Sequence, residues 1–220
     1  MSFKSKATQL LTVFSVGMAG LFASNAASAD VSYNIGWASE YHFRGILQKN
    51  SSASAGVDFE QNGFYIGTWT ADVGDGLEVD GYFGYGIEVD DFSASIGFTG
   101  YYYTGEFDDT YEEINLNLGY SWFSFEYSTG EYDNFDGPTQ DYQFIAGTLD
   151  IGDTGFYLKY GTFEDDFDGN YIEAGYGVTI SEIDFGISFI RASDELSDQL
   201  DSNGSPTESE SIIFTIGKSF

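Results

Sequence analysis

The segment Ile183-Asp184-Phe185-Gly186-Ile187-Ser188-Phe189 alternates strictly between large apolar residues and small or polar ones. Because successive side chains of a β-strand point to opposite faces, this segment predicts a strand with one apolar and one polar face. The same alternation recurs along the chain, for example over residues 31–37, 92–99 and 114–120. About twelve such segments follow residue 30, so the sequence predicts an all-β fold of about twelve strands.

The composition of the two faces indicates what each face meets. The polar faces are rich in Gly, Ser, Thr and Asn, small residues that suit the concave inside of a barrel. Rings gather near the strand ends, as in the aromatic girdles of a membrane barrel. These rings are Tyr33, Tyr41, Phe43, Tyr102, Tyr120 and Tyr142. The pattern predicts an antiparallel up-and-down transmembrane β-barrel; a soluble sandwich or lipocalin-like barrel is the alternative.

Short and long connections alternate between the predicted strands. The short ones are residues 61–63, 90–91, 121–122, 151–154 and 181–182, and the long ones are 44–51, 72–76, 104–110, 129–138, 164–169 and 193–208. Outer-membrane barrels have short periplasmic turns and long external loops. Most acidic residues fall in the long connections or at their margins, among them Glu78, Glu112 and Glu113. No domain boundary interrupts residues 30–220, which are expected to form one barrel.

Residues 1–29 have the three-part form of a cleaved signal peptide. Lys4 and Lys6 precede an apolar stretch over residues 10–22, and Ala27-Ser28-Ala29 gives the small-residue cleavage pattern. The apolar stretch is short for a membrane-spanning helix. We therefore expect export past the inner membrane of a Gram-negative bacterium and residence in its outer membrane.

The charge and cysteine content exclude several classes of function. The 220 residues carry 36 Asp and Glu against 7 Lys and Arg, a formal net charge of −29. A chain this acidic is not expected to bind nucleic acid, because phosphates require basic partners. With no Cys, thiolate metal sites and cysteine nucleophiles are ruled out. No cofactor is expected.

The acidic loops are candidate sites for metal ions. The segment Asp166-Phe167-Asp168-Gly169-Asn170 is similar to the start of a calcium loop, but the twelfth position, where such a loop needs Glu, is Gly177. No specific metal site is predicted. Loose binding of divalent cations that bridge lipopolysaccharide phosphates stays open.

Charged residues on the polar faces are the candidate pore lining. By strand parity they are Glu40, His42, Arg44, Asp58, Asp80, Glu88, Glu126, Lys159, Glu173 and Asp184. Acids outnumber bases in this set, and a lumen of that kind favours cations. The alternative is that these groups pair and plug the barrel, because twelve strands lie between barrels filled by side chains and open channels.

An enzymatic function is not expected. His42 is the single histidine, so a Ser-His mechanism would have to use it, and its parity points away from lipid. The row Glu40, His42, Arg44 is better explained as part of a polar lumen.

The final segment of the chain is an amphipathic strand that ends on Phe220. A terminal Phe on such a strand resembles the signal that the outer-membrane barrel assembly machinery reads. Expected partners are therefore this machinery, outer-membrane lipid and lipopolysaccharide, and small solutes or cations.

Two segments resemble the TorF family of small porins of the Gram-negative outer membrane. The first is Ser39-Glu40-Tyr41-His42-Phe43-Arg44-Gly45 within residues 34–48, and the second is Gly63-Phe64-Tyr65-Ile66-Gly67-Thr68-Trp69. The resemblance covers the first third of the chain and implies an outer-membrane barrel with a transport function, without a catalytic motif. We expect passive diffusion of small, preferentially cationic solutes. The alternative is a non-conducting barrel with a structural or adhesion role through its acidic external loops.

Overall fold

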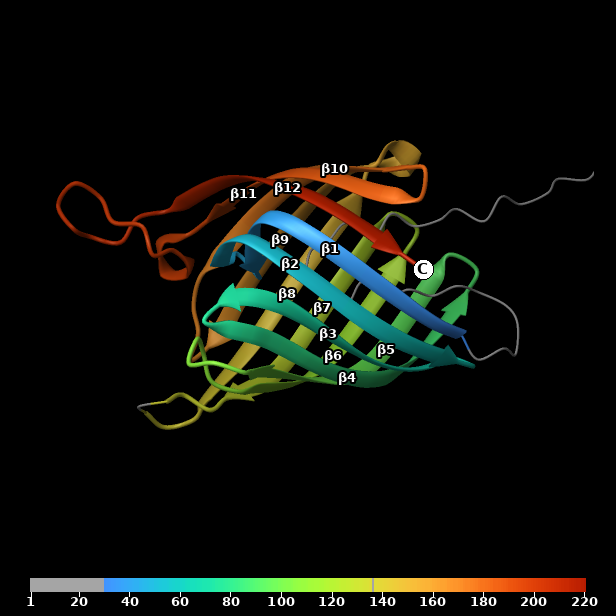
Figure 1. Cartoon of the computed structure of the whole chain (residues 1–220), viewed down its shortest axis with the longest axis horizontal. Helices are drawn as coiled ribbons and strands as arrows, with labels where there is room; N and C mark the ends of the chain where they lie inside the picture. Colours follow the sequence, from blue (N-terminus) through green and yellow to red (C-terminus); the bar gives the residue numbers. More distant parts are fainter. Residues whose placement is uncertain (1–29, 136) are drawn as a thin grey trace, which may run out of the picture.

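Twelve antiparallel strands close into a barrel in the computed structural model, which describes residues 30–135 and 137–220 (Figure 1). The predicted signal peptide, residues 1–29, lies outside the described residues. Each strand pairs with its neighbours in sequence, and β1 pairs with β12 to close the ring. The strands are β1 (Asp30–Phe43), β2 (Ile46–Gln61), β3 (Phe64–Gly74), β4 (Gly76–Val89), β5 (Phe92–Tyr103), β6 (Tyr111–Tyr120), β7 (Phe123–Tyr132), β8 (Gln140–Asp150), β9 (Phe156–Asp165), β10 (Asn170–Ile180), β11 (Ile183–Ala192) and β12 (Ser209–Ser219). The predicted barrel of about twelve strands is confirmed.

The two ends of the barrel differ. At one end the strands are joined by tight turns, such as Asn62-Gly63 and Ser121-Trp122, and Phe220 lies at this end beside Tyr33. At the other end the β11–β12 connection extends well beyond the wall (Figure 1). Short 3-10 turns η1 (Gly152–Thr154) and η2 (Asp194–Leu196) lie in connections, and neither is long and apolar enough to cross a membrane.

Two predicted long connections are in fact tight. Residues 44–51 were expected to form an external loop, but β1 and β2 run on to a two-residue turn at Arg44-Gly45. Likewise, only Asp75 separates β3 from β4. The polar residues of these segments form strand pairs, so a polar composition alone did not distinguish a loop from a strand here.

The outer surface of the barrel is apolar. Large apolar side chains that are exposed there come from strands around the ring, for example Ile35, Ile66, Tyr85, Ile114, Leu158, Phe189 and Phe214. The inside carries small, polar and charged residues together with buried rings such as Phe144 and Phe163. A water-soluble monomer rarely exposes a continuous apolar belt of this extent.

Inward tyrosines fill the space left by glycines on the neighbouring strands. The ring of Tyr65 on β3 lies against Gly84 on β4, and its hydroxyl also covers Gly97 on β5. A Cβ at Gly84 would overlap Tyr65 and the carbonyl oxygen of Ile96. This packing explains why glycines recur on the inner face.

Replacing Gly84 by Val is expected to destabilise the barrel by about 1–3 kcal/mol, the usual cost of overpacking a tight site. Gly81→Val on the same strand is the matched control, because a Cβ at Gly81 meets no atom within 4 Å. Urea unfolding of both variants in lipid vesicles measures the difference. Equal urea midpoints for the two variants would show that the close packing of Tyr65 on Gly84 does not contribute to the free energy of unfolding.

Candidate functional site

The β1–β2 hairpin leaves the barrel wall. β1 pairs with β12 only from Asn34 to Ala38, and β2 pairs with β3 only from Ser54 onward. Beyond these points the two strands pair with each other alone, through Glu40 opposite Asn50 and on to the turn. We call residues 39–53 the inward hairpin, because its tip contacts the inside of the opposite wall.

Two serines satisfy backbone groups where the hairpin departs. The Phe214 N–H of β12, which loses its strand partner there, donates to Ser39 Oγ at 2.8 Å. On the other side, Ser52 Oγ donates to the Asp72 carbonyl oxygen at 2.7 Å. Since unpaired backbone groups inside a protein are costly, these bonds stabilise the departure of the hairpin.

The turn at the tip has left-handed backbone at both residues, with φ of 47° at Arg44 and 93° at Gly45. Such turns match the twist of a two-stranded hairpin, and glycine adopts them without strain. A side chain at Gly45 would also lie 2.9 Å from Tyr171 Cδ1 of β10. The tip is therefore packed closely against the inner wall.

Arg44 extends from the tip across the lumen. Its Nη1 and Nη2 donate to the two carboxylate oxygens of Glu113 on β6 at 2.7 and 2.8 Å. Nη2 also donates to Glu126 at 3.1 Å and to Ser128 at 3.0 Å, both on β7. The guanidinium lies 4.3 Å from the ring centroid of Phe144 on β8. With Arg44 5% and Glu113 1% exposed, this bidentate pair is desolvated and joins the hairpin to the far wall.

Rings and acids fill the lumen around the hairpin. The Tyr41 hydroxyl donates a hydrogen bond to the Glu78 carboxylate, which also accepts one from the Tyr103 hydroxyl at 3.3 Å. Glu78 is 1% exposed. Asp80, two residues further along β4, is 4% exposed and its Oδ1 has no hydrogen-bond partner in the described part of the protein.

A second cluster of buried side chains lies under the long connections. Its buried members are Tyr142, Phe144, Ala146, Phe163, Tyr171, Ile190, Ala192, Leu196 and Ile213, with Ile46 of the hairpin packed against them. Phe167 stacks on Tyr142 at 5.2 Å between ring centroids. The lumen is thus packed with side chains at this end.

Three rings predicted for the lipid-facing girdle lie inside instead. Tyr41 is buried against Trp69, and Phe43 packs against Tyr101, because β1 leaves the barrel wall beyond Ala38 and both faces of the hairpin then lie inside. Tyr142 is inward because β8 presents its apolar row to the lumen. The girdle prediction was wrong for these residues.

The predicted lining residues divide into two groups. Glu40, His42, Arg44, Asp80, Glu126, Lys159 and Glu173 lie at or near the inward hairpin. Asp58, Glu88 and Asp184 lie toward the end with tight turns, where Asp58 accepts from Tyr82 and Asp184 from Thr179. Glu78 and Glu113 lie inside the barrel, although their place in the sequence predicted loop margins. Their parity with Asp80 and Asn115 was the signal that could have located them inside.

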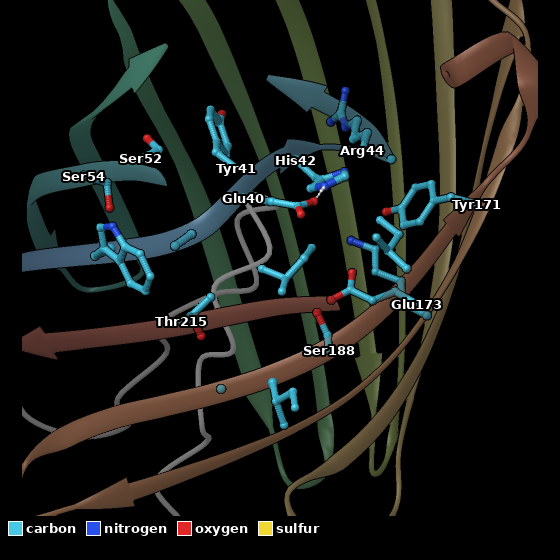
Figure 2. A pocket seen from close by; sticks show the side chains of 18 of the residues that line it. Glu40, Tyr41, His42, Arg44, Ser52, Ser54, Tyr171, Glu173, Ser188 and Thr215 are labelled. Carbon is cyan, nitrogen blue, oxygen red and sulfur yellow. Dashed lines mark hydrogen bonds and ion pairs between the residues drawn. The ribbon is translucent and has the colours of Figure 1, made fainter. Parts of the chain in front are cut away.

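A cavity of about 60 Å³ remains beside the hairpin. Glu40, His42 and Arg44 of the hairpin line one side, and Tyr171 and Glu173 of β10 line the other (Figure 2). Lys159 of β9 also lines the cavity. His42 Nε2 lies 2.9 Å from Glu40, while its Nδ1 is buried without a partner among the described residues. Lys159 Nζ lies 3.5 Å from Glu126.

Metal ligation has no support in the described residues, because no group of three or more His, Asp or Glu side chains there could hold an ion. The calcium-like segment near Asp166 is no exception. Asp168 is occupied locally, since Oδ1 accepts from the Gly169 N–H at 2.7 Å.

Residues 23–220 match a family described as "Bacterial protein of unknown function (Gcw_chp)". The chain belongs to the Gcw_chp family. The match does not bear on the TorF resemblance, which stays a prediction. The chain matches none of the curated proteins.

Two solved structures share the barrel fold of this Gcw_chp protein. One, described as "Unveiling the Mechanism Behind the in-meso Crystallization of Membrane Proteins", is 8% identical with a TM-score of 0.57 over 86% of this chain and 83% of that one. The NanC porin is 12% identical with a TM-score of 0.52 over 87% of this chain and 99% of its own. The Gcw_chp chain is therefore a porin-like barrel in its fold.

Proposed function

We propose that this protein is an outer-membrane porin of Gram-negative bacteria that admits small solutes by passive diffusion and prefers cations. Support for the membrane location comes from the apolar outer belt, which needs lipid to cover it. Export by the predicted signal peptide and assembly through the strand that ends on Phe220 belong to the same proposal. So do contact with lipopolysaccharide and kinship with the TorF porins.

The observation that carries the cation preference is the excess of acids inside the wall. The inner carboxylates are Glu40, Asp58, Glu78, Asp80, Glu88, Glu113, Glu126, Glu173 and Asp184, against the bases Arg44 and Lys159 and the single His42. A low-dielectric wall around a lumen of one sign concentrates ions of the opposite sign. The inward hairpin sets the width of this path.

Reversal potentials in a potassium chloride gradient test the preference. Refolded protein in a planar bilayer is expected to give a reversal potential of the sign that indicates selectivity for potassium over chloride. The double variant Asp58→Asn with Glu88→Gln is expected to reduce this potential, because these acids lack cationic partners among the described residues. Glu112→Gln, on the outer face, is the control. A reversal potential of the opposite sign, which indicates selectivity for chloride, would contradict the cation preference.

A second candidate is a non-conducting barrel with a structural or adhesion role. The packed cluster under the long connections favours it, as do the acids that these connections expose, such as Glu106 and Asp166. The same bilayer recording separates the two. A folded, heat-modifiable barrel without discrete conductance steps would exclude the porin and leave this second function.

A further inference from the structure

The cavity beside the inward hairpin has an unusual set of hydrogen-bond groups for an interior space. Glu40 and His42 line it side by side on the hairpin, and Glu173 lines it from the other side (Figure 2). Its volume of about 60 Å³ is the room of about four to six water molecules. A solute with a similar number of non-hydrogen atoms would fit.

The two bases on the cavity are already neutralised by acids behind them. Arg44 is held by the bidentate contact with Glu113, and both Arg44 and Lys159 contact Glu126. Lys159 also lies opposite Glu173 in the strand register, although its ammonium contact is with Glu126. Four charges therefore balance, two positive and two negative, before Glu40 and Glu173 are counted.

Glu40 and Glu173 have neutral partners in the hydrogen bonds of the described residues. Glu173 accepts from the Tyr157 hydroxyl, and Glu40 contacts His42 Nε2. Each carboxylate has two oxygens and several lone pairs, so each retains capacity to accept. Once Arg44 and Lys159 are matched with Glu113 and Glu126, the carboxylates of Glu40 and Glu173 are left on the cavity without an ion pair to Lys or Arg among the described residues.

His42 adds a third acceptor. When Nε2–H donates to Glu40, the neutral ring carries a lone pair on Nδ1. That atom has no partner in the described residues, and the side chain is 6% exposed. A buried polar atom without a partner calls for an occupant that can bond to it.

We propose that the cavity binds small solutes that carry a primary ammonium group. The three N–H donors of such a group match the three acceptors, which are the carboxylates of Glu40 and Glu173 and Nδ1 of His42. Its positive charge offsets the excess negative charge of the cavity. The rings of Trp69 and Tyr171 on the cavity wall suit an organic cation. The inference rests on the proposed function, of which it names the solute class.

Ethanolamine is the probe, because it has one primary ammonium group and four non-hydrogen atoms. Trp37 and Trp69 line the cavity and report binding by fluorescence in the refolded full-length barrel. A saturable change is expected with ethanolamine and none with ethylene glycol, which lacks the ammonium, or acetate, which has the opposite charge. An equal response to ethanolamine and ethylene glycol would overturn the proposal.

Two variants test the acceptors. Glu40→Gln and Glu173→Gln should each weaken ethanolamine binding about tenfold or more, as expected for a lost bond to a charged donor. Glu182→Gln, in the tight β10–β11 turn, should bind as the unchanged protein does. Should Glu173→Gln fail to fold, Glu40→Gln remains decisive, since its carboxylate is partly solvated. Unchanged affinity in the folded Glu40→Gln variant would refute the site.

Conductance separates this proposal from the porin function. A barrel that conducts potassium but does not respond to ethanolamine would disprove the ammonium site alone. A barrel that binds ethanolamine but shows no conductance would disprove the porin function alone.

Discussion

Replacing residues 41–49 by an Asn-Gly turn is expected to raise the single-channel conductance several-fold. Glu40 and Asn50 lie directly opposite each other in the register, so a two-residue turn can join them. The excised segment carries Tyr41, Phe43 and Arg44, whose side chains fill the lumen. Their removal lets water reach the inner acids and widens the narrowest part of the path.

The excised barrel should still fold, because the hairpin contributes nothing to the ring of strand pairs beyond Ala38 and Ser54. Glu78 and Glu113 lose their partners on the hairpin but gain water, which avoids an unpaired buried charge. Replacing residues 201–204 in the β11–β12 connection by Asn-Gly is the control, with conductance expected to stay unchanged. Unchanged conductance in a folded excised barrel would show that the hairpin does not limit passage.

Arg44→Gln is expected to cost about 3–5 kcal/mol of unfolding free energy, because it leaves the Glu113 carboxylate buried and unpaired. It should also increase conductance, since the tip loses its link to β6 and β7. Urea unfolding in lipid vesicles measures the first effect and bilayer recording the second.

A double-mutant cycle tests whether Arg44 and Glu113 interact directly, and an exposed ion pair serves as the control. Arg44→Gln combined with Glu113→Gln should cost less than the sum of the single changes, because no charge is then left unpaired. Arg191→Gln breaks the pair with Glu208, which is about half exposed on both sides, and should cost less than about 1 kcal/mol. Additive costs for Arg44 and Glu113 would contradict a direct coupling.

The barrel was predictable from the sequence because lipid and lumen impose a period of two on every strand. Residues 183–189 of β11 show it without interruption. Parity then located most of the inner charges, including Lys159 and Glu173 on neighbouring strands.

The site was less predictable, because parity fails where a strand bends or the lumen is apolar. β1 no longer pairs with β12 beyond Ala38, so Tyr41 lies buried in the lumen instead of on the expected lipid face. On β8, alternation separates Phe144 from Gln143 but does not say which of them faces inward when the lumen itself is packed with rings. The contact of Arg44 with Glu113 joins residues 69 positions apart, a distance at which strand patterns carry no information.

The seam between β1 and β12 joins parts of the chain that lie far apart in sequence. Ser39 and Phe214, bonded at this seam, are 175 residues apart. Joining ends so distant costs about 3 kcal/mol more chain entropy than closing a tight hairpin of about four residues. The inward hairpin continues from β1, one of the two strands that meet at this seam. The strand that closes the ring therefore also carries the segment that fills it, so wall and filling are joined in one element.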